Sequence, residues 1–439
     1  MSGQGKRSER PSPLVGAMLR RELWPWALLG FTLGMVEGAT AAVLLKHRFA
    51  GATDAAAVNF AVAFVSGAPA MSNVVSFVWA NIAHGRARVR LMVALQAAFA
   101  VTVGIVGLAP AATGGLLLTV GSILAARVLW AGILTTRSSI WIANYPRQML
   151  GSVTGRMVIA GSLTVALAAA ATALLIEDRR IDPRWLYALA ALVGLAGAWA
   201  YRAVRVRREY RLLAEENKAI ARSDAFSLRT LLTILREDAD YRRYLAWLGL
   251  YGVGNLMLTS QLVVIFTDQL HIPGAVQIAM LAVFPLAAQP LFVPLWARMF
   301  DGTHVIAYRA RQAWALVVSV GLFGVGVLLE SQLLLWSGAA TMAISTAGAN
   351  IGWSLGHNDF AGPGRAQHYM GVNVTLTGLR GMLAPPLGIA AYQGLESLQP
   401  GCGRWSMLIP FAGTFAGALG FTMMHRGMRR DESARSKTR

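Results

Sequence analysis

The chain has 439 residues, of which 55% are hydrophobic and only 14% are charged. A soluble domain carries about 25% charged residues, so this composition excludes an ordinary soluble protein and indicates a chain that lies mostly in a membrane. The formal net charge of +19 would also suit a nucleic-acid-binding protein, but Lys and Arg lie between apolar runs and at the two chain ends. We therefore expect a lipid bilayer, and no nucleic acid, as partner. The single cysteine, Cys402, excludes an internal disulfide and a cysteine-based metal cluster.

Apolar runs of bilayer-spanning length recur along nearly the whole chain. A helix needs about 20 apolar residues to cross about 30 Å of hydrocarbon. Twelve runs approach or exceed that length: residues 24–45, 56–80, 91–109, 114–136, 157–176, 185–204, 244–267, 273–297, 312–330, 332–355, 370–394 and 404–425. The sequence therefore predicts an all-α membrane protein with twelve transmembrane helices arranged as two six-helix halves. The ninth and tenth runs are separated only by Glu330-Ser331-Gln332.

Polar segments divide this chain into five expected parts. They are a cytoplasmic N-terminal tail (1–23), an N-terminal six-helix half (24–204), a cytoplasmic central linker (205–243), a C-terminal six-helix half (244–425) and a cytoplasmic C-terminal tail (426–439). The stretch Tyr201–Arg243 mixes Arg with acidic residues and contains amphipathic sequence, so we expect a tether on the anionic membrane surface. A regulatory or partner-binding role is the alternative.

The distribution of Lys and Arg predicts the orientation of the helices, because cytoplasmic segments carry an excess of these residues. If the N-terminus is cytoplasmic, most Lys and Arg fall on the inside. The outside segments hold only Lys46, Arg48, Arg179, Arg180, Arg184 and Arg404. An odd number of spans would scramble this alternation. We therefore expect both termini inside, in a bacterial cytoplasmic (inner) membrane.

The ends of the second and eighth predicted spans share a short sequence pattern. One reads Trp79-Ala-Asn-Ile-Ala-His84-Gly and the other reads Trp296-Ala-Arg-Met-Phe-Asp301-Gly. Internal repeats are common in transporters. Because the two copies lie six spans apart, they predict a duplicated six-helix unit.

In this layout the chain resembles the major facilitator superfamily. That family places a Gly-x-x-x-Asp-Arg/Lys-x-Gly-x-Arg/Lys loop between spans two and three and echoes it between spans eight and nine. This chain keeps the basic cluster, with Ala in place of the leading Gly in both copies and His84 in place of the first Asp. The resemblance implies a secondary transporter whose loop latches neighbouring helices in one conformation. The gating-loop candidates are His84, Arg86, Arg88, Arg90, Asp301 and Arg309. The alternative is that these Arg residues only follow the positive-inside rule.

Three ionisable residues, Glu37, Arg127 and Arg380, lie near the middle of predicted spans. A charge there costs at least about 2.5–3.5 kcal/mol, so each needs a partner or water. The first and fourth spans are neighbours in the resembled fold, so we expect Arg127 to pair with Glu37 and Glu37 to couple the proton or coordinate the substrate. Two Arg against one Glu favour an organic anion as substrate. A permanent ion pair that only fixes packing is the alternative. We expect Arg137, near a span end, to snorkel to the interface.

Neutral polar residues on spans seven and ten complete the candidate site. Asn255, Gln261 and Asn350 fall on helices that line the central cavity in the resembled fold. Each could instead bridge two helices through a hydrogen bond worth about 0.6 kcal/mol.

Sequence motifs for other functions do not occur. No Gly-x-x-x-x-Gly-Lys-Ser/Thr loop is present, so ATP is not expected as the energy source within this chain. No His-Glu-x-x-His or Gly-x-Ser-x-Gly pattern indicates an enzyme, and His357 with Asp359 makes a poor metal-ligand set. We therefore expect a monomeric, proton-coupled transporter of a small solute, not an enzyme, with no cofactor and no metal. A non-transporting receptor or scaffold of transporter descent, and a membrane-embedded enzyme, are the alternatives.

Overall fold

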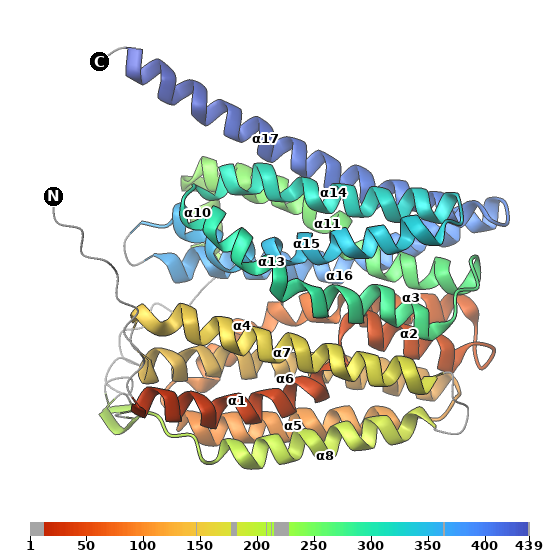
Figure 1. The fold of residues 1–439 in the computed structure, drawn as a ribbon, viewed down its shortest axis with the longest axis horizontal. Coiled ribbons are helices and arrows are strands. Elements are labelled where there is room, and N and C mark those ends of the chain that lie inside the picture. The colour runs from red at the N-terminus through yellow and green to blue at the C-terminus, as the bar shows by residue number, and fades with distance from the viewer. Residues whose placement is uncertain are drawn as a thin grey trace.

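The computed structural model (Figure 1) describes residues 13–145, 147–176, 182–207, 209–211, 213–214, 228–362 and 365–437. Within these ranges every regular element is a helix, as the sequence predicted. Residues 1–12, 215–227 and 438–439 of the predicted tails and linker lie outside the described residues.

The first half of the chain forms helices as far as residue 201. Their bounds are α1 Pro13–Gly34, α2 Gly38–Phe49, α3 Ala55–Met71, η1 Ser72–Val75, α4 Ser76–Ala83, α5 Arg88–Leu108, α6 Thr113–Asn144, α7 Arg147–Ile176 and α8 Pro183–Tyr201. In the predicted linker, α10 covers Leu228–Glu237.

The second half begins directly after α10. Its helices are α11 Ala239–Asp268, α12 Gly274–Ile278, the π-helical η3 Ala279–Val283, α13 Phe284–Asp301, α14 Val305–Leu328, α15 Gln332–Leu355, η4 Gly356–Asp359, α16 Ala366–Leu398, η5 Cys402–Met407 and α17 Leu408–Lys437.

Nine helical segments among the described residues are long and apolar enough to cross a membrane. They are Gly16–Phe49, Ala55–Ala83, Arg88–Leu108, Thr113–Asn144, Val153–Ile176, Ala239–Asp268, Gly274–Asp301, Val305–Leu328 and Cys402–Arg430. Three more long helices, α8, α15 and α16, run alongside them (Figure 1). The sequence of α15 is rich in Ala, Gly, Ser and Thr, and α16 carries polar residues and two prolines. The count of twelve spans stays a prediction.

The helices form two groups that lie side by side (Figure 1). The start of α1 and the end of α17 lie at the same end of the bundle, which we call the terminal end; the opposite end is the far end. The halves pack against each other through α2, α3, η1 and α7 on one side and α11, α12, α13 and α16 on the other. By contrast, α4 continues the second span to the terminal end and packs against α6 of its own half. The halves therefore meet mainly at the centre and the far end.

Two equivalent contacts support the predicted internal repeat. Trp79 Nε1 on α4 donates to a backbone carbonyl of α6 at 2.8 Å. Trp296 Nε1 on α13 donates to a backbone carbonyl of α15, also at 2.8 Å. In each case the indole ring also covers a glycine one turn further along, Gly132 or Gly348, where an added Cβ atom would come within 2.8 or 2.9 Å of the ring. The two halves thus join corresponding helices by the same device.

The helices extend beyond several of the predicted apolar runs. α1 begins at Pro13, inside the predicted N-terminal tail, and α6 continues to Asn144, past the predicted end at residue 136. Run length measures the hydrocarbon thickness, whereas a helix continues into the interfacial region of the membrane. The closely spaced ninth and tenth runs are separate helices: α14 ends at Leu328 and α15 begins at Gln332, with Glu330 between them at a left-handed φ of 54°.

Candidate functional site

The predicted pairing of Glu37 with Arg127 is confirmed. Arg127 Nη1 on α6 lies 2.8 Å from Glu37 Oε2 at the start of α2. The Arg127 side chain is only 6% exposed, whereas that of Glu37 is 30% exposed. The Nε of Arg127 is buried and finds no hydrogen-bond partner among the described residues. A buried cation therefore meets a carboxylate that water or a solute can reach.

A break between α1 and α2 positions this carboxylate. α1 ends at Gly34, α2 begins at Gly38, and Glu37 is the N-cap residue of α2 with an extended backbone (φ −84°, ψ 127°). Gly34 lies so close to α7 that an added Cβ atom would come within 2.6 Å of Ala168 Cβ. An added Cβ atom on Gly38 would instead meet nothing within 4 Å. The break thus leaves open space beside Glu37, and the free N–H groups at the start of α2 add partial positive charge there.

Arg380 is bound within its own half. Its Nη1 donates to the backbone carbonyl of Leu248 on α11. Its Nη2 donates to Thr377 Oγ1 at 2.8 Å, and its Nε donates to the carbonyl of Leu376 at 3.2 Å. In the described part of the chain, none of its contacts is an ion pair with an acidic side chain. The charge of Arg380 is therefore balanced by dipoles alone.

The three neutral candidates occupy different environments. Gln261 is fully buried, and its Nε2 donates to the carbonyls of Gly388 at 3.1 Å and Ser406 at 3.3 Å. Gln261 therefore bridges α11 to α16 and η5, as the alternative to a cavity-lining role predicted. Asn255 is half-buried on α11, and Asn350 is exposed on α15. Among the described residues, neither of these two side chains forms a hydrogen bond with the Glu37–Arg127 pair.

Most of the gating-loop candidates lie at helix ends near the terminal end. His84 and Arg86 are exposed in the turn after α4, and Arg90 is exposed in the first turn of α5. Arg88 is only 7% exposed at the start of α5. Asp301 is exposed as the last residue of α13.

Arg309 is an exception, and its placement in that loop is corrected. It lies inside α14 and is 1% exposed. Its Nη1 donates to Gln312 Oε1 at 2.7 Å and its Nη2 to the carbonyl of Ala349 at 3.4 Å. An added Cβ atom on Gly352 of α15 would come within 2.8 Å of the guanidinium. Arg309 therefore links α14 to α15 within the second half. The loop between α13 and α14 ends before Val305, so the last basic residue of the second motif copy already lies inside α14.

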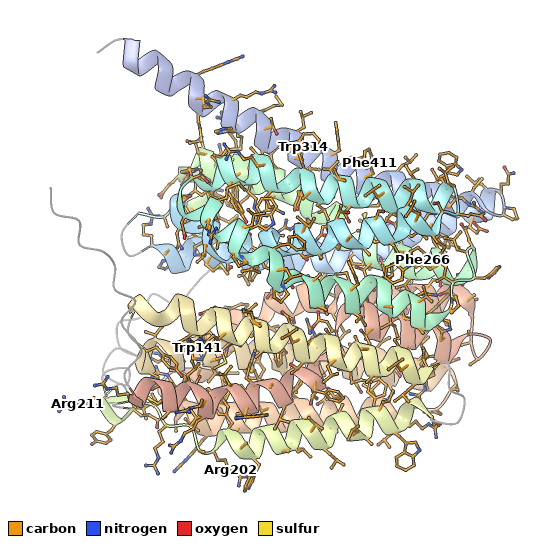
Figure 2. The ribbon with its side chains drawn as sticks, viewed as in Figure 1. Trp141, Arg202, Arg211, Phe266, Trp314 and Phe411 are labelled. Carbon is orange, nitrogen blue, oxygen red and sulfur yellow. The ribbon has the colours of Figure 1, made fainter. Side chains whose placement is uncertain are left out.

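A second ion pair, not predicted from the sequence, joins the two halves. Lys46, near the end of α2, has a side chain only 5% exposed, and its Nζ lies 2.8 Å from Asp268 Oδ1 at the end of α11. Lys46 Nζ also donates to Asn59 Oδ1 on α3 at 2.6 Å. Figure 2 labels Phe266, which precedes Asp268 on α11 toward the far end. The charge distribution predicts Lys46 only as an outside charge. The sequence does offer one signal for this pair: Lys46 and Asp268 lie at corresponding ends of the first span of each half.

Arg137 is enclosed by aromatic rings instead of snorkelling, so that expectation was wrong. Its guanidinium carbon lies 3.9 Å from the ring centroid of Trp26 and 4.4 Å from that of Trp141, and its Nε is buried (Figure 2 labels Trp141). These π faces stabilise the cation in place. Glu22, 2% exposed, accepts hydrogen bonds from Trp141 Nε1 at 2.7 Å and Tyr145 Oη at 3.1 Å. Glu22 precedes the first apolar run of the sequence, so run length alone does not identify it as a buried acid.

The geometry at the Glu37–Arg127 site is that of a charge-assisted ion pair between a buried guanidinium and a partly exposed carboxylate. The described residues contain no group of three or more His, Cys, Asp or Glu side chains that could hold a metal ion.

Comparison with known proteins gives matches in structure only. No protein-family profile and no curated protein sequence matches the chain. The chain is similar to the nucleoside transporter NupG, with a TM-score of 0.70 and 13% identity over 92% of this chain and 99% of that chain. It is similar to a D-xylose-proton symporter, with a TM-score of 0.72 and 10% identity over 93% and 97% of the two chains. A bacterial homologue of the human lysosomal transporter Spinster, in an inward-facing conformation, gives a TM-score of 0.67 and 11% identity over 95% and 98%.

At these identities the similarity establishes the fold. The chain has the major facilitator-type fold of these solved proteins, as its repeat and loop pattern predicted. With its apolar helices, this makes it an integral membrane protein. All three solved proteins are transporters.

Proposed function

We propose that this chain is a secondary transporter that carries a small solute across the membrane by alternating access, with Glu37 and Arg127 as the coupling pair. The observation that carries this proposal is the ionisable pair itself, a 30% exposed carboxylate on a 6% exposed guanidinium within the first and fourth candidate spans. Charges at membrane depth are costly and mark transport pathways and proton relays. The fold shared with a nucleoside transporter and a D-xylose-proton symporter supports the same function.

Contacts between the halves support alternating access. Lys46 and Asp268 link the halves at the far end, and Gln393 Nε2 donates to the carbonyl of Ala56 at 3.2 Å near the same end. In the proposed cycle this is the state that opens toward the terminal end, and these links must break in the opposite state. An ion pair that exists in only one of two states biases the equilibrium between them.

The proposed coupling follows from the geometry of the Glu37–Arg127 pair. In the proposed mechanism the Arg127 guanidinium and a proton compete for the Glu37 carboxylate, so a substrate or a helix movement that draws the guanidinium away allows Glu37 to take up a proton. Coupling requires this linkage, because the proton must bind with different affinity in the two states. The helix break beside Glu37 supplies the space for a solute group to reach the pair.

We propose an organic anion as the substrate class. Arg127 is neutralised by Glu37, but among the described residues Arg380 is bound only to carbonyl and hydroxyl oxygens. A site with this surplus positive charge attracts a carboxylate or phosphate more than a cation. The half-buried Asn255 and exposed Asn350 are the proposed neutral substrate contacts.

The remaining parts of the proposal concern topology. We propose twelve spans, with both termini and the linker 205–243 on the cytoplasmic side of a bacterial inner membrane, in a monomeric protein. The common location of the start of α1 and the end of α17 at one end of the bundle supports an even number of spans (Figure 1).

The test begins with substrate identification. Ligands that bind the native state raise its melting temperature, so a thermal-shift screen of organic anions on the purified protein identifies the substrate. The protein is then reconstituted into liposomes with and without a pH gradient. Wild type should accumulate the substrate against its gradient, whereas Glu37→Gln should exchange substrate but lose accumulation driven by the pH gradient. Glu330→Gln, which removes an exposed carboxylate at the far end, is the matched control and should accumulate as wild type does.

Each result decides between the proposed function and its alternatives. If Glu37→Gln does not fold, the double variant Glu37→Gln with Arg127→Gln removes both charges and takes its place. Undiminished accumulation by a folded Glu37→Gln protein would falsify its role in coupling. Binding without any transport by wild type would identify a receptor or scaffold of transporter descent instead.

A further inference from the structure

A groove of about 510 Å³ lies on the surface of the first half, between α5 and α8 near the terminal end. It is lined by Val89, Arg90, Val93, Ala94, Ala97 and Arg202. Figure 1 shows α5 and α8 at the outer edge of the first half, away from the second half. The groove therefore opens toward the surrounding lipid and is separate from the Glu37–Arg127 site.

Two basic side chains lie at the mouth of the groove. The side chains of Arg90 and Arg202 are exposed, and neither forms an ion pair or hydrogen bond with the described residues. Figure 2 shows Arg202 at the outer edge of the bundle, beside the terminal end of α8. Arg90 lies in the first turn of α5, where the helix dipole adds further positive charge. Glu209 is a nearby acid, but its Oε1 already accepts the backbone N–H of Arg88 at 2.9 Å.

Apart from these two side chains, the lining of the groove is apolar. Its floor on α5 consists of small or β-branched side chains, which leave room for a hydrocarbon chain. On α8, exposed apolar side chains follow the helix up to Arg202: Trp185, Leu189, Leu192, Leu195 and Trp199. The groove thus has a positive mouth and an apolar floor, and it lies beside an exposed apolar face of α8.

We propose that this groove binds an anionic glycerophospholipid, with its phosphate between Arg90 and Arg202 and an acyl chain along α5 and α8. Arginine forms strong, charge-assisted hydrogen bonds with phosphate oxygens. Basic pockets between transmembrane helices suit anionic headgroups for this reason. A zwitterionic lipid carries its own cation and gains less from the two guanidinium groups. A free phosphate ion would use the guanidinium groups but not the apolar floor.

The proposal is tested by native mass spectrometry of the full-length protein with equimolar dioleoyl phosphatidylglycerol and phosphatidylcholine. Wild type should retain the anionic lipid preferentially. The double variant Arg90→Gln with Arg202→Gln should lower this preference by about 30-fold. This is the factor expected when two basic residues that each attract an anionic headgroup are removed. The control Arg236→Gln with Arg298→Gln removes the same charge from exposed positions elsewhere and should leave the preference unchanged.

A second pair of variants tests the apolar floor without changing charge. Ala94→Phe fills the groove, whereas Ala98→Phe places the same ring on α5 at an exposed position outside it. Ala94→Phe should lower lipid retention, Ala98→Phe should not, and inorganic phosphate should not displace the lipid. Unchanged retention in the Arg90 and Arg202 double variant, equal loss in both Arg pairs, no effect of Ala94→Phe, or displacement by phosphate would each overturn the proposal.

Discussion

Lys46 on α2 and Asp268 on α11 form an ion pair that links the two halves of the protein, with Nζ 2.8 Å from Oδ1. The lysine is buried and also contacts Asn59, whereas the Asp268 side chain is 32% exposed. In this structure the pair thus places the ammonium group inside the protein beside a partly exposed carboxylate. In the proposed alternating-access cycle, opening of the far end would separate the two side chains and expose both charges to water.

The first prediction is that loss of this pair weakens closure of the far end. Asp268→Asn leaves a buried ammonium group without its counter-ion, at a cost below the about 3–5 kcal/mol of a fully buried pair because Asp268 is partly exposed. Cysteines at Ala56 and Gln393, whose backbone and side chain meet across the halves, report closure by cross-linking in a Cys402→Ser background. Cross-linking should be slower in Asp268→Asn.

Arg404→Gln supplies the control for this experiment. It breaks the ion pair between Arg404 and Glu330, at 3.0 Å, which lies within the second half. This variant should cross-link as the parent does. Equal cross-linking in Asp268→Asn and the parent would show that the Lys46 pair does not hold the halves together.

The second prediction concerns the close approach of α16 to α3 at the centre. An added Cβ atom on Gly381 would come within 2.6 Å of Ala70 Cβ and 2.7 Å of the backbone N of Met71. Backbone atoms cannot move aside locally, so Gly381→Ala should push the halves apart and destabilise this state by about 1–3 kcal/mol. Gly394→Ala on the same helix meets nothing within 4 Å and should have no such effect. Thermal unfolding measures both, and a melting temperature for Gly381→Ala equal to that of Gly394→Ala would contradict the prediction.

The sequence predicted the fold well because hydropathy identifies each apolar helix separately, and a repeated motif is visible by comparing two segments of the chain directly. Trp79 and Trp296 indicated the duplicated unit, and the structure gives both the same hydrogen bond to the corresponding helix. Arg127 could be paired with Glu37 because an intramembrane charge needs a counter-charge and few are available. The resemblance to a known fold supplied the adjacency of their helices.

The rest of the site depends on contacts between distant segments, which run length and spacing do not encode. Lys46 lies near a span end, where a positive charge is equally compatible with the interface, and only the packing of α2 against α11 shows its partner. The expectation for Arg137 was wrong for the same reason, since tryptophan rings from α1 and α6 enclose its guanidinium. Arg309 followed a loop motif in sequence but lies on a buried helix face.

The third prediction is topological. Compartment-sensitive reporters inserted after Arg430 and within the linker 205–243 should both report the cytoplasm, because Lys and Arg concentrate in these segments. A reporter at Gly51, in the far-end turn between α2 and α3, should report the opposite compartment. An external signal from either of the first two positions would contradict the twelve-span arrangement.

The fourth prediction distinguishes the two partners of the Glu37–Arg127 pair by stability. Glu37→Gln leaves a guanidinium that is 6% exposed without its counter-ion, whereas Arg127→Gln leaves a carboxylate that is 30% exposed and within reach of water. Unpaired charge is costly in proportion to its burial, so Glu37→Gln should lower the free energy of unfolding more than Arg127→Gln does. The double variant should lose less than the sum of the two single variants, since neither charge remains. Chemical denaturation in detergent measures all three. Equal losses in the two single variants that add in the double variant would show that the pair contributes nothing to the stability of this state, and that Glu37 and Arg127 act independently.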